Sequence, residues 1–269
     1  MTHSRRAGEK VPWPVLFLGH GSPMNAVRDT RYSTAWRTLG ESLGKPSAVL
    51  CISAHWLTQG TQITSNEKPK TIHDFGGFPE ELFQVQYPAP GAPSLAKRSA
   101  ALLGVGEKAL TEEWGLDHGA WSVLRHLYPQ ADVPVVQLSL DVNLSESAHV
   151  ALARRLAPLR NEGVLILASG NIVHNLRLLN WTENAPVPEW AKEFDQAVEK
   201  AVGENSIDRL IHWNKLTPTS SHAHPSPDHY WPFLYAVALR NSGDKISYPI
   251  TGFQNSTISM RGVLISPNS

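Results

Sequence analysis

The stretch TSSHAHPSPDH at residues 219–229 places three histidines, His222, His224 and His229, within eight positions. Short histidine-rich tracts are typical of metal binding or of an expression tag. A tag is terminal and uninterrupted, whereas this stretch is internal and broken up by Ser and Pro. We therefore interpret it as part of a metal site whose remaining ligands come from elsewhere in the chain.

Three more histidines follow apolar runs that are typical of buried strands. His20 ends VLFLGH, His55 ends VLCISAH and His174 ends VLILASGNIVH. The carboxyl ends of parallel strands lie along one edge of an open α/β sheet, where ligands bind. A single histidine at a strand end is more often a capping or packing residue than a ligand, but the placement that these three share favours a common site.

Two histidines are expected to reach the same edge from other elements. His229 lies near the start of the apolar helix YWPFLYAVAL, after Ser226 and Pro227, which suit the cap and the first turn of a helix. His118, in LDHGAW, follows a predicted strand at residues 108–112 after a short loop. The sequence thus predicts five histidines around one point.

The other histidines have less specific interpretations. Either His222 or His224 is expected to support a ligand or contact substrate, and the other to face solvent. His73 lies in a loop with Gly76 and Gly77, which suit either a hinge or a simple turn. We expect ordinary surface or capping roles for His3, His126, His149 and His212.

The sequence lacks the motifs of several other catalytic sites. The HGS around Ser22 is not the G-x-S-x-G turn of an α/β-hydrolase nucleophile. G-x-G-x-x-G, the P-loop and H-E-x-x-H are absent. The single cysteine, Cys51, lies in the apolar run AVLCIS and is predicted to be a small buried hydrophobe. A metal site built from imidazoles remains the best-supported chemistry.

Strands that alternate with helices predict a single α/β domain over residues 1–269, with its core at about 15–265. The runs predicted as central strands are 15–19, 48–53, 133–140 and 164–170. The segments predicted as helices are 33–43, 93–103, 145–160, 186–202 and 206–213. Right-handed crossovers between them imply a largely parallel central sheet flanked by helices, with the metal site at the carboxyl ends of the strands. Late strands after about residue 245 are expected at an antiparallel edge, and the loop at 66–94 is expected to act as a lid.

Composition limits the possible classes of protein. Lys+Arg and Asp+Glu number 24 each, so the net charge is zero and gives no basic excess for binding nucleic acid. No apolar run reaches the ~18 residues that cross a bilayer, and the basic HSRR is not followed by the apolar core of a signal peptide. We expect a cytoplasmic protein, a monomer or small homo-oligomer, with no nucleic-acid or membrane partner.

Seven segments taken together resemble one known family. In chain order they are FLGHGSPMNA, CISAHW, TIHDFGGFPEELFQVQYPAPG, GLDHGAWSVLRHLYP, PVVQLSLD, ASGNIVHNL and AHPSPDHYWPFLYA. They resemble the DOPA extradiol dioxygenase family, within the class III extradiol ring-cleavage dioxygenases. The catalytic subunit of protocatechuate 4,5-dioxygenase is a more distant relative. The resemblance extends over about residues 15–265 and implies a single α/β domain with a mononuclear non-haem metal.

The resemblance implies roles for the five histidines. His20, His55 and His229 match metal ligands. His174 matches the catalytic base of the distant relatives and, in the DOPA branch, a fourth metal ligand, so both interpretations stay open. His118 matches the histidine that hydrogen-bonds the catechol or oxygen.

The metal expected from the resemblance is one divalent ion per chain. The distant relatives carry Glu as the third ligand where this chain has His229, and the adjacent Asp228 is the alternative ligand. Dioxygenase activity implies Fe(II), whereas an all-imidazole set also suits Zn(II).

The implied reaction inserts both atoms of O2 into a DOPA-like catechol and opens the ring beside its two hydroxyls. Histidine suits the proton transfers because its pKa lies near the working pH. Candidate substrate contacts are His222, Trp121 and Phe75. Arg125 and Arg177 are candidates for pairing with a substrate carboxylate.

Two other functions are compatible with the same histidines. A zinc hydrolase would use a bound water with a pKa near 7, with His174 or His118 as the base. A metal-binding scaffold without catalysis is disfavoured, because a structural zinc site has no need for these two extra titratable groups. Oxygen consumption separates a dioxygenase from a hydrolase.

Overall fold

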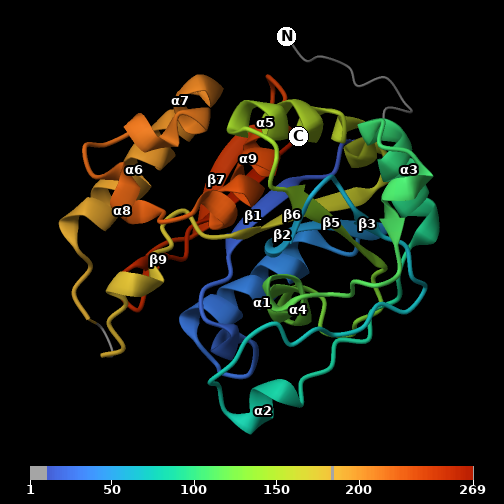
Figure 1. The fold of residues 1–269 in the computed structure, drawn as a ribbon, viewed down its shortest axis with the longest axis horizontal. Coiled ribbons are helices and arrows are strands. Elements are labelled where there is room, and N and C mark those ends of the chain that lie inside the picture. Colours follow the sequence, from blue (N-terminus) through green and yellow to red (C-terminus); the bar gives the residue numbers. More distant parts are fainter. Residues whose placement is uncertain (1–10, 183–184, 269) are drawn as a thin grey trace.

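An eight-stranded sheet crosses the centre of the molecule (Figure 1). The computed structural model describes residues 11–182 and 185–268. In spatial order the strands are β4 (Leu110–Thr111), β3 (Ile63–Thr64), β5 (Val135–Asp141), β2 (Ala48–Thr58), β6 (Val164–Gly170), β1 (Val15–Gly19), β10 (Gly262–Ser266) and β7 (Lys245–Ile250). The short strands β8 (Phe253–Gln254) and β9 (Ile258–Ser259) form a second ladder.

Four parallel strands form the middle of the sheet. β5, β2, β6 and β1 pair in parallel in that order, whereas β10 is antiparallel to β1 and β7 is antiparallel to β10. The predicted parallel sheet and antiparallel late strands are confirmed. β2 is longer than predicted, because it continues to Thr58, and its register against β5 shifts between Ile52 and Leu57. His55 therefore lies inside an irregular strand end rather than after it.

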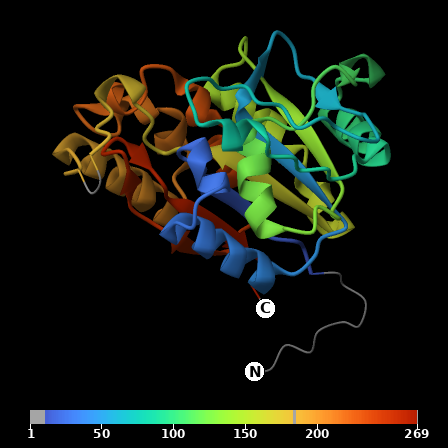
Figure 2. The ribbon, with the colours of Figure 1, turned by 90° about the horizontal axis from the view of Figure 1, so that it is seen from below.

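Helices cover both faces of the sheet (Figures 1 and 2). One face carries α1 (Arg31–Leu43) and α4 (His118–Leu127), and the other carries α3 (Pro93–Leu103), α5 (Glu146–Arg154) and α9 (Trp231–Ala238). Next to α9, three helices pack together: α6 (Glu189–Gly203), α7 (Ile207–Ile211) and α8 (Ser220–Ala223). The remaining short helices are α2 (Glu80–Phe83), η1 (Pro23–Ala26), η2 (Glu107–Ala109), η3 (Ala157–Glu162), η4 (Leu176–Leu178), η5 (Trp213–Lys215) and η6 (Pro227–His229).

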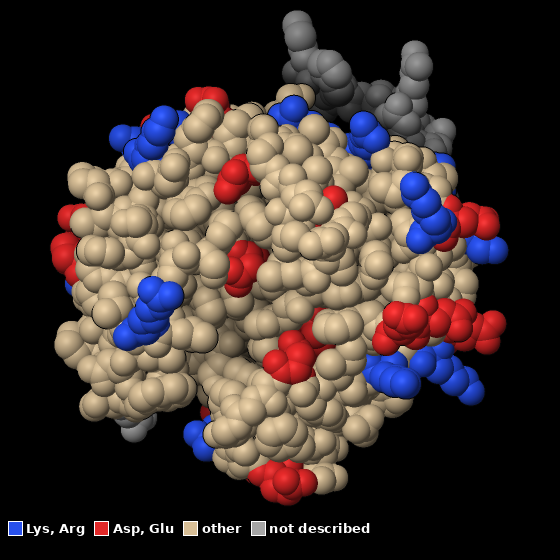
Figure 3. Space-filling view, viewed as in Figure 1, with Lys and Arg blue, Asp and Glu red and all other residues tan. Residues whose placement is uncertain are grey.

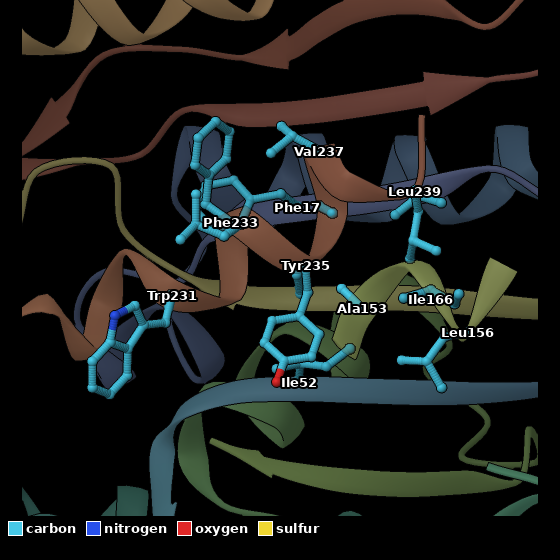
Figure 4. Packing of buried hydrophobic residues seen from close by; sticks show 14 of the residues in the cluster. Phe17, Ile52, Ala153, Leu156, Ile166, Trp231, Phe233, Tyr235, Val237 and Leu239 are labelled. Atoms are coloured by element: carbon cyan, nitrogen blue, oxygen red, sulfur yellow. The ribbon is translucent and has the colours of Figure 1, made fainter. Parts of the chain in front are cut away.

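Alternate residues of β1 face two separate apolar cores. Leu16 and Leu18 belong to the core under α1 and α4, whereas Phe17 belongs to the core under α9. The ring of Phe17 meets Phe233 of α9 edge-on, with the centroids 5.3 Å apart (Figure 4). Because both faces of β1 are buried, the strand is a continuous apolar run instead of an alternating one.

The helix predicted at residues 145–160 is divided in two. α5 begins where expected, with the Ser145 hydroxyl accepting a hydrogen bond from the N–H of Ala148. It ends at Arg154, and η3 follows with Pro158 in its first turn. Proline has no N–H to donate to a continuing helix, which explains why the regular α-helix does not extend to residue 160.

Cys51 is buried in β2, as predicted. Lys and Arg are interspersed with Asp and Glu on the face shown in Figure 3. Over the described ranges 11–182 and 185–268, every helix is too short or too polar to cross a bilayer.

His149, predicted to be a surface or capping residue, is fully buried between α5 and α9. Its Nδ1 lies 3.1 Å from the hydroxyl oxygen of Tyr235, and its ring packs against the indole of Trp231. The prediction was wrong because the partners come from α9, more than 80 residues later, and local sequence does not show that packing.

His126 was also predicted at the surface and is buried, with its Nε2 2.8 Å from the carbonyl oxygen of Asn25. His212 is exposed, as predicted. His3 lies outside the described residues.

The burial of His149 predicts a loss of stability in mild acid. Burial lowers the pKa of His149 to about 4, against ~6.5 in an unfolded chain. The unfolded state therefore takes up the proton first, and the contribution of neutral His149 is complete above about pH 6.5 and is lost progressively toward about pH 4. When the pH falls from about 7 to about 5, this residue should lower the free energy of unfolding by about 2 kcal/mol.

Urea unfolding of the wild type and of His149→Gln at the two pH values checks this. The variant should lose about 2 kcal/mol less than the wild type. An equal loss in both proteins would contradict the account.

Candidate functional site

Three histidines from different elements converge at the carboxyl ends of the parallel strands. His20 follows β1, His55 lies in the extended end of β2, and His229 ends η6 just before α9. One ligand atom from each lies within 4.8 Å of the others. The Nε2 atoms of His20 and His55 are 3.1 Å apart. This edge of the sheet is where the sequence analysis expected them.

His229 reaches this position because Gly170, at the end of β6, has no side chain. The carbonyl oxygen of His229 accepts a hydrogen bond of 2.9 Å from the N–H of Asn171. A Cβ on Gly170 would lie 2.2 Å from that oxygen. A larger residue would therefore push His229 away from the other two histidines.

Hydrogen bonds at Nδ1 orient two of these rings. The Ser169 hydroxyl donates to the carbonyl oxygen of Gly119 over 2.6 Å, so it accepts from Nδ1–H of His20 at 3.0 Å. The Asp228 carboxylate accepts from Nδ1–H of His229 at 2.6 Å. Both rings therefore present an unprotonated Nε2, and the buried Nε2 of His229 has no hydrogen-bond partner among the described residues. Because the Asp228 carboxylate is bonded to Nδ1 of His229, it orients the ring from the side away from Nε2.

Burial keeps the three rings neutral. It lowers the pKa of His20, His55 and His229 well below the ordinary value, and the neighbouring imidazoles lower it further. Neutral imidazoles are the form of histidine that binds metals. Three converging lone pairs from nitrogen donors therefore fit one divalent transition metal, such as iron or zinc.

His174 stacks on His229 instead of pointing its ligand atom into the same group. The two rings are 3.4 Å apart between centroids and nearly parallel, at 4°. The His174 backbone is held by a hydrogen bond of 2.9 Å from its N–H to the carbonyl oxygen of Ala223. Burial lowers the pKa of His174 to about 4. The ring is therefore neutral near pH 7. Its ligand atoms are not part of the group formed by His20, His55 and His229.

His118 and Asp74 lie beside His55. The rings of His55 and His118 are 3.8 Å apart between centroids. Asp74 Oδ2 is 3.0 Å from Nδ1 of His118 and 3.7 Å from Nδ1 of His55. Sequence reasoning missed Asp74, although it adjoins His73 in TIHDFGG. The signal that could have identified Asp74 is its carboxylate, which lies in an otherwise apolar and Gly-rich part of the predicted lid.

A cavity of about 1400 Å³ opens over these residues. The histidines that line it are His20, His55, His118, His174 and His229. Phe75, Gly76, Gly77 and Phe78 of the predicted lid form part of its wall. The site therefore combines strand ends with the loop that the sequence analysis expected above them.

Two of the predicted substrate contacts lie away from the cavity lining. Trp121 is fully buried in α4, beneath Phe75, and its Nε1–H donates to the carbonyl oxygen of Ile72 over 2.8 Å. His222 is exposed on α8, with its ring edge-on to Trp190. Packing of the large indole into the core, and the outward position of α8, separate both from the five histidines.

His224 has a packing role. It is buried, its Nε2 lies 2.6 Å from the carbonyl oxygen of Ile172, and its ring meets Trp213 and Tyr230 edge-on. The segment TSSHAHPSPDH therefore brings one histidine, His229, into the cavity.

The arginines at the cavity differ from those expected. Arg28 and Arg31, both exposed, line the cavity at its rim, whereas Arg125 and Arg177 do not line it. These two side chains come from the turn before α1 and from its first residue. No local pattern around Arg28 and Arg31 links them to the strand ends.

Comparisons with known proteins agree on one family. The model of the catalytic LigB subunit of aromatic ring-opening dioxygenase matches residues 15–262. The 4,5-DOPA dioxygenase extradiol of Escherichia coli (strain K12) is 43% identical over 256 residues, which is 94% of this chain and 94% of that protein. The protein of the same name from Beta vulgaris is 39% identical over 237 residues, with 86% and 88% covered.

A solved structure agrees with these sequence matches. The crystal structure of an uncharacterized protein from Escherichia coli K12 matches with a TM-score of 0.80 and 38% sequence identity, covering 94% of this chain and 100% of that chain. The family match at residues 15–262 includes every histidine of the cavity. The chain belongs to the LigB family of aromatic ring-opening dioxygenases, that is, to the class III extradiol dioxygenases.

Proposed function

We propose that this protein is an Fe(II)-dependent extradiol dioxygenase that inserts both atoms of O2 into a catechol with a DOPA-like side chain. The observation that carries the proposal is the convergence of three neutral imidazoles beside two further histidines in one cavity. The relatives named 4,5-DOPA dioxygenase extradiol support this class of substrate.

His20, His55 and His229 are the proposed ligands of a single metal. When bound, a ferrous ion supplies open coordination positions for the catechol oxygens and a redox couple between catechol and O2. The same donors suit zinc, so a purified sample can carry zinc in place of iron.

His174 is the proposed base for a catechol hydroxyl. Burial lowers its pKa to about 4, so the ring is neutral near pH 7 and keeps one unprotonated nitrogen that can face a catechol hydroxyl. The role of a base is favoured over that of a fourth ligand because its ring lies face to face with His229. In that stacked position the ring lies beside the proposed ligand His229, and His174 lines the cavity.

His118 is the proposed hydrogen-bond partner of the substrate or of oxygen. It lines the cavity next to His55. Phe75 packs edge-on to His118, with the centroids 5.5 Å apart, and is the proposed wall for the catechol ring. At the rim, Arg28 and Arg31 are suited to pair with a carboxylate on the side chain of the substrate.

Oxygen uptake by anaerobically Fe(II)-loaded protein given L-DOPA tests the proposal. We expect one O2 consumed per catechol, together with a new yellow chromophore from the ring-opened product. Zinc-loaded protein is the control and should consume no oxygen, because zinc has no redox couple. Absence of uptake with iron bound, for L-DOPA and several other catechols, would contradict the proposal and favour a hydrolase or a scaffold.

Substitution of the proposed ligands should remove the metal. His20→Ala, His55→Ala and His229→Ala should each lower the iron content from about one per chain to about a tenth or less, since even losing a residue that supports a ligand costs 10–100-fold in affinity. Metal analysis after dialysis measures this. Retention of a full equivalent by any of the three would overturn that assignment.

Two other histidines provide the contrast. His118→Ala should keep the iron but lower kcat by about 10²–10⁴-fold, as expected for loss of an acid–base group. His222→Ala changes an exposed histidine outside the cavity and should keep both iron and turnover.

A further inference from the structure

Asp74 is a carboxylate at the cavity that the proposed roles leave unused. It lines the cavity, and its side chain is 16% exposed. It comes from the predicted lid loop, whereas the histidines around it come from β2 and α4. Both oxygens of this carboxylate face His118.

The two carboxylate oxygens lie against two different parts of His118. Asp74 Oδ1 accepts a hydrogen bond of 2.9 Å from the backbone N–H of His118. Asp74 Oδ2 lies 3.0 Å from Nδ1 of the same residue. The backbone N–H belongs to the first turn of α4, where helical donors have no partner within the helix and a negative charge is favourable. Asp74 thus accepts a hydrogen bond from the main chain of His118, and its second oxygen lies at ion-pair distance from the imidazole of the same residue.

The contact with His55 is weaker. Asp74 Oδ2 is 3.7 Å from Nδ1 of His55, which is longer than a hydrogen bond. The other buried carboxylate nearby, Asp117, is occupied elsewhere: its Oδ1 accepts from the Ser53 hydroxyl at 2.7 Å and from the N–H of Ala120 at 3.1 Å. Asp74 is therefore the carboxylate that engages the His118 ring.

The backbone holds Asp74 firmly against α4. The N–H of Ile72 donates to the carbonyl oxygen of Leu116 and the N–H of Leu116 donates to that of Lys70, each over 2.7 Å. The indole of Trp121 adds its hydrogen bond to Ile72. A Cβ on Gly115 would lie 2.1 Å from the carbonyl oxygen of Lys70, so the glycine permits this close approach. The carboxylate is thus placed by paired backbone rather than by a free loop.

We propose that Asp74 is a positioning residue that holds His118 as the Nδ1–H tautomer, with Nε2 left for the substrate or for oxygen. This inference rests on the proposed dioxygenase function for its effect on turnover. A carboxylate can only accept hydrogen bonds, so it selects the protonated Nδ1. The arrangement matches the carboxylate–histidine pairs that set which ring nitrogen does the chemistry.

The test is a double-mutant cycle with Asp74→Asn and His118→Ala in Fe(II)-loaded protein. An amide that still accepts from the His118 backbone presents its NH2 to the ring and favours the wrong tautomer. Asp74→Asn alone should lower kcat about 10–100-fold, with KM changed less than about twofold and iron content unchanged. In the His118→Ala background, Asp74→Asn should cause no further loss, since the two residues act as a unit.

Asp132→Asn is the matched control. Asp132 is an exposed carboxylate paired with Lys45 over 2.6 Å and does not line the cavity, so this variant should keep wild-type kcat. Wild-type kcat in Asp74→Asn, or an undiminished loss in the His118→Ala background, would overturn the proposal. Loss of iron from Asp74→Asn would do so too, because Asp74 would then be a metal ligand with His55 and His118.

A second measurement does not depend on activity. Long-range ¹H–¹⁵N correlation of the imidazoles in zinc-loaded protein reports the tautomer of each neutral histidine. The His118 ring should be the Nδ1–H tautomer in the wild type and should shift toward Nε2–H in Asp74→Asn. An unchanged His118 tautomer would overturn the proposal. If all forms of the protein lacked oxygen uptake, the dioxygenase function would fail while this readout still decided the role of Asp74.

Discussion

Three histidine rings, of which His20 and His229 are buried and His55 is half-buried, must stay neutral and present a nitrogen to one point, and the rest of the site depends on this constraint. Burial keeps them neutral, because a charged imidazole is costly away from water. Partners at Nδ1 set the direction: Ser169 for His20 and Asp228 for His229. Buried lone pairs without partners are unfavourable, and a divalent cation satisfies them together. Binding of a divalent metal should therefore stabilise the folded state.

Pairing of the backbone in the sheet sets the positions of these histidines. Parallel pairing of β1, β6 and β2 fixes where His20 and His55 emerge, and the bare backbone of Gly170 admits the segment that carries His229. The N-terminus of α4 and the paired backbone at residues 70–72 then bring His118 and Asp74 next to His55. The proposed metal ligands and the residues proposed to move protons thus come from separate elements, although their rings are in contact.

Much of this was predictable because it rests on local patterns. Apolar runs ending in histidine placed His20 and His55 at one edge of a parallel sheet, and the helix start placed His229 near them. What local patterns could not show is pairing between distant segments. Asp74 acquires its role from a residue 44 positions later, and His149 is buried by a helix more than 80 positions later. Residue type was misleading for Trp121 of α4, because a large aromatic ring can either contact a substrate or pack in the core. Its indole is fully buried in the core.

The measurement that tests the central claim most directly is anomalous diffraction at the iron edge from anaerobic crystals of the Fe(II)-loaded protein. The account predicts one strong peak per chain, roughly 2.0–2.2 Å from the Nε2 atoms of His20, His55 and His229, as expected for metal–imidazole bonds. A peak held instead by His55, Asp74 and His118, the second group whose ligand atoms lie within 4.8 Å of one another, would contradict it. So would crystals in which the iron occupies neither group.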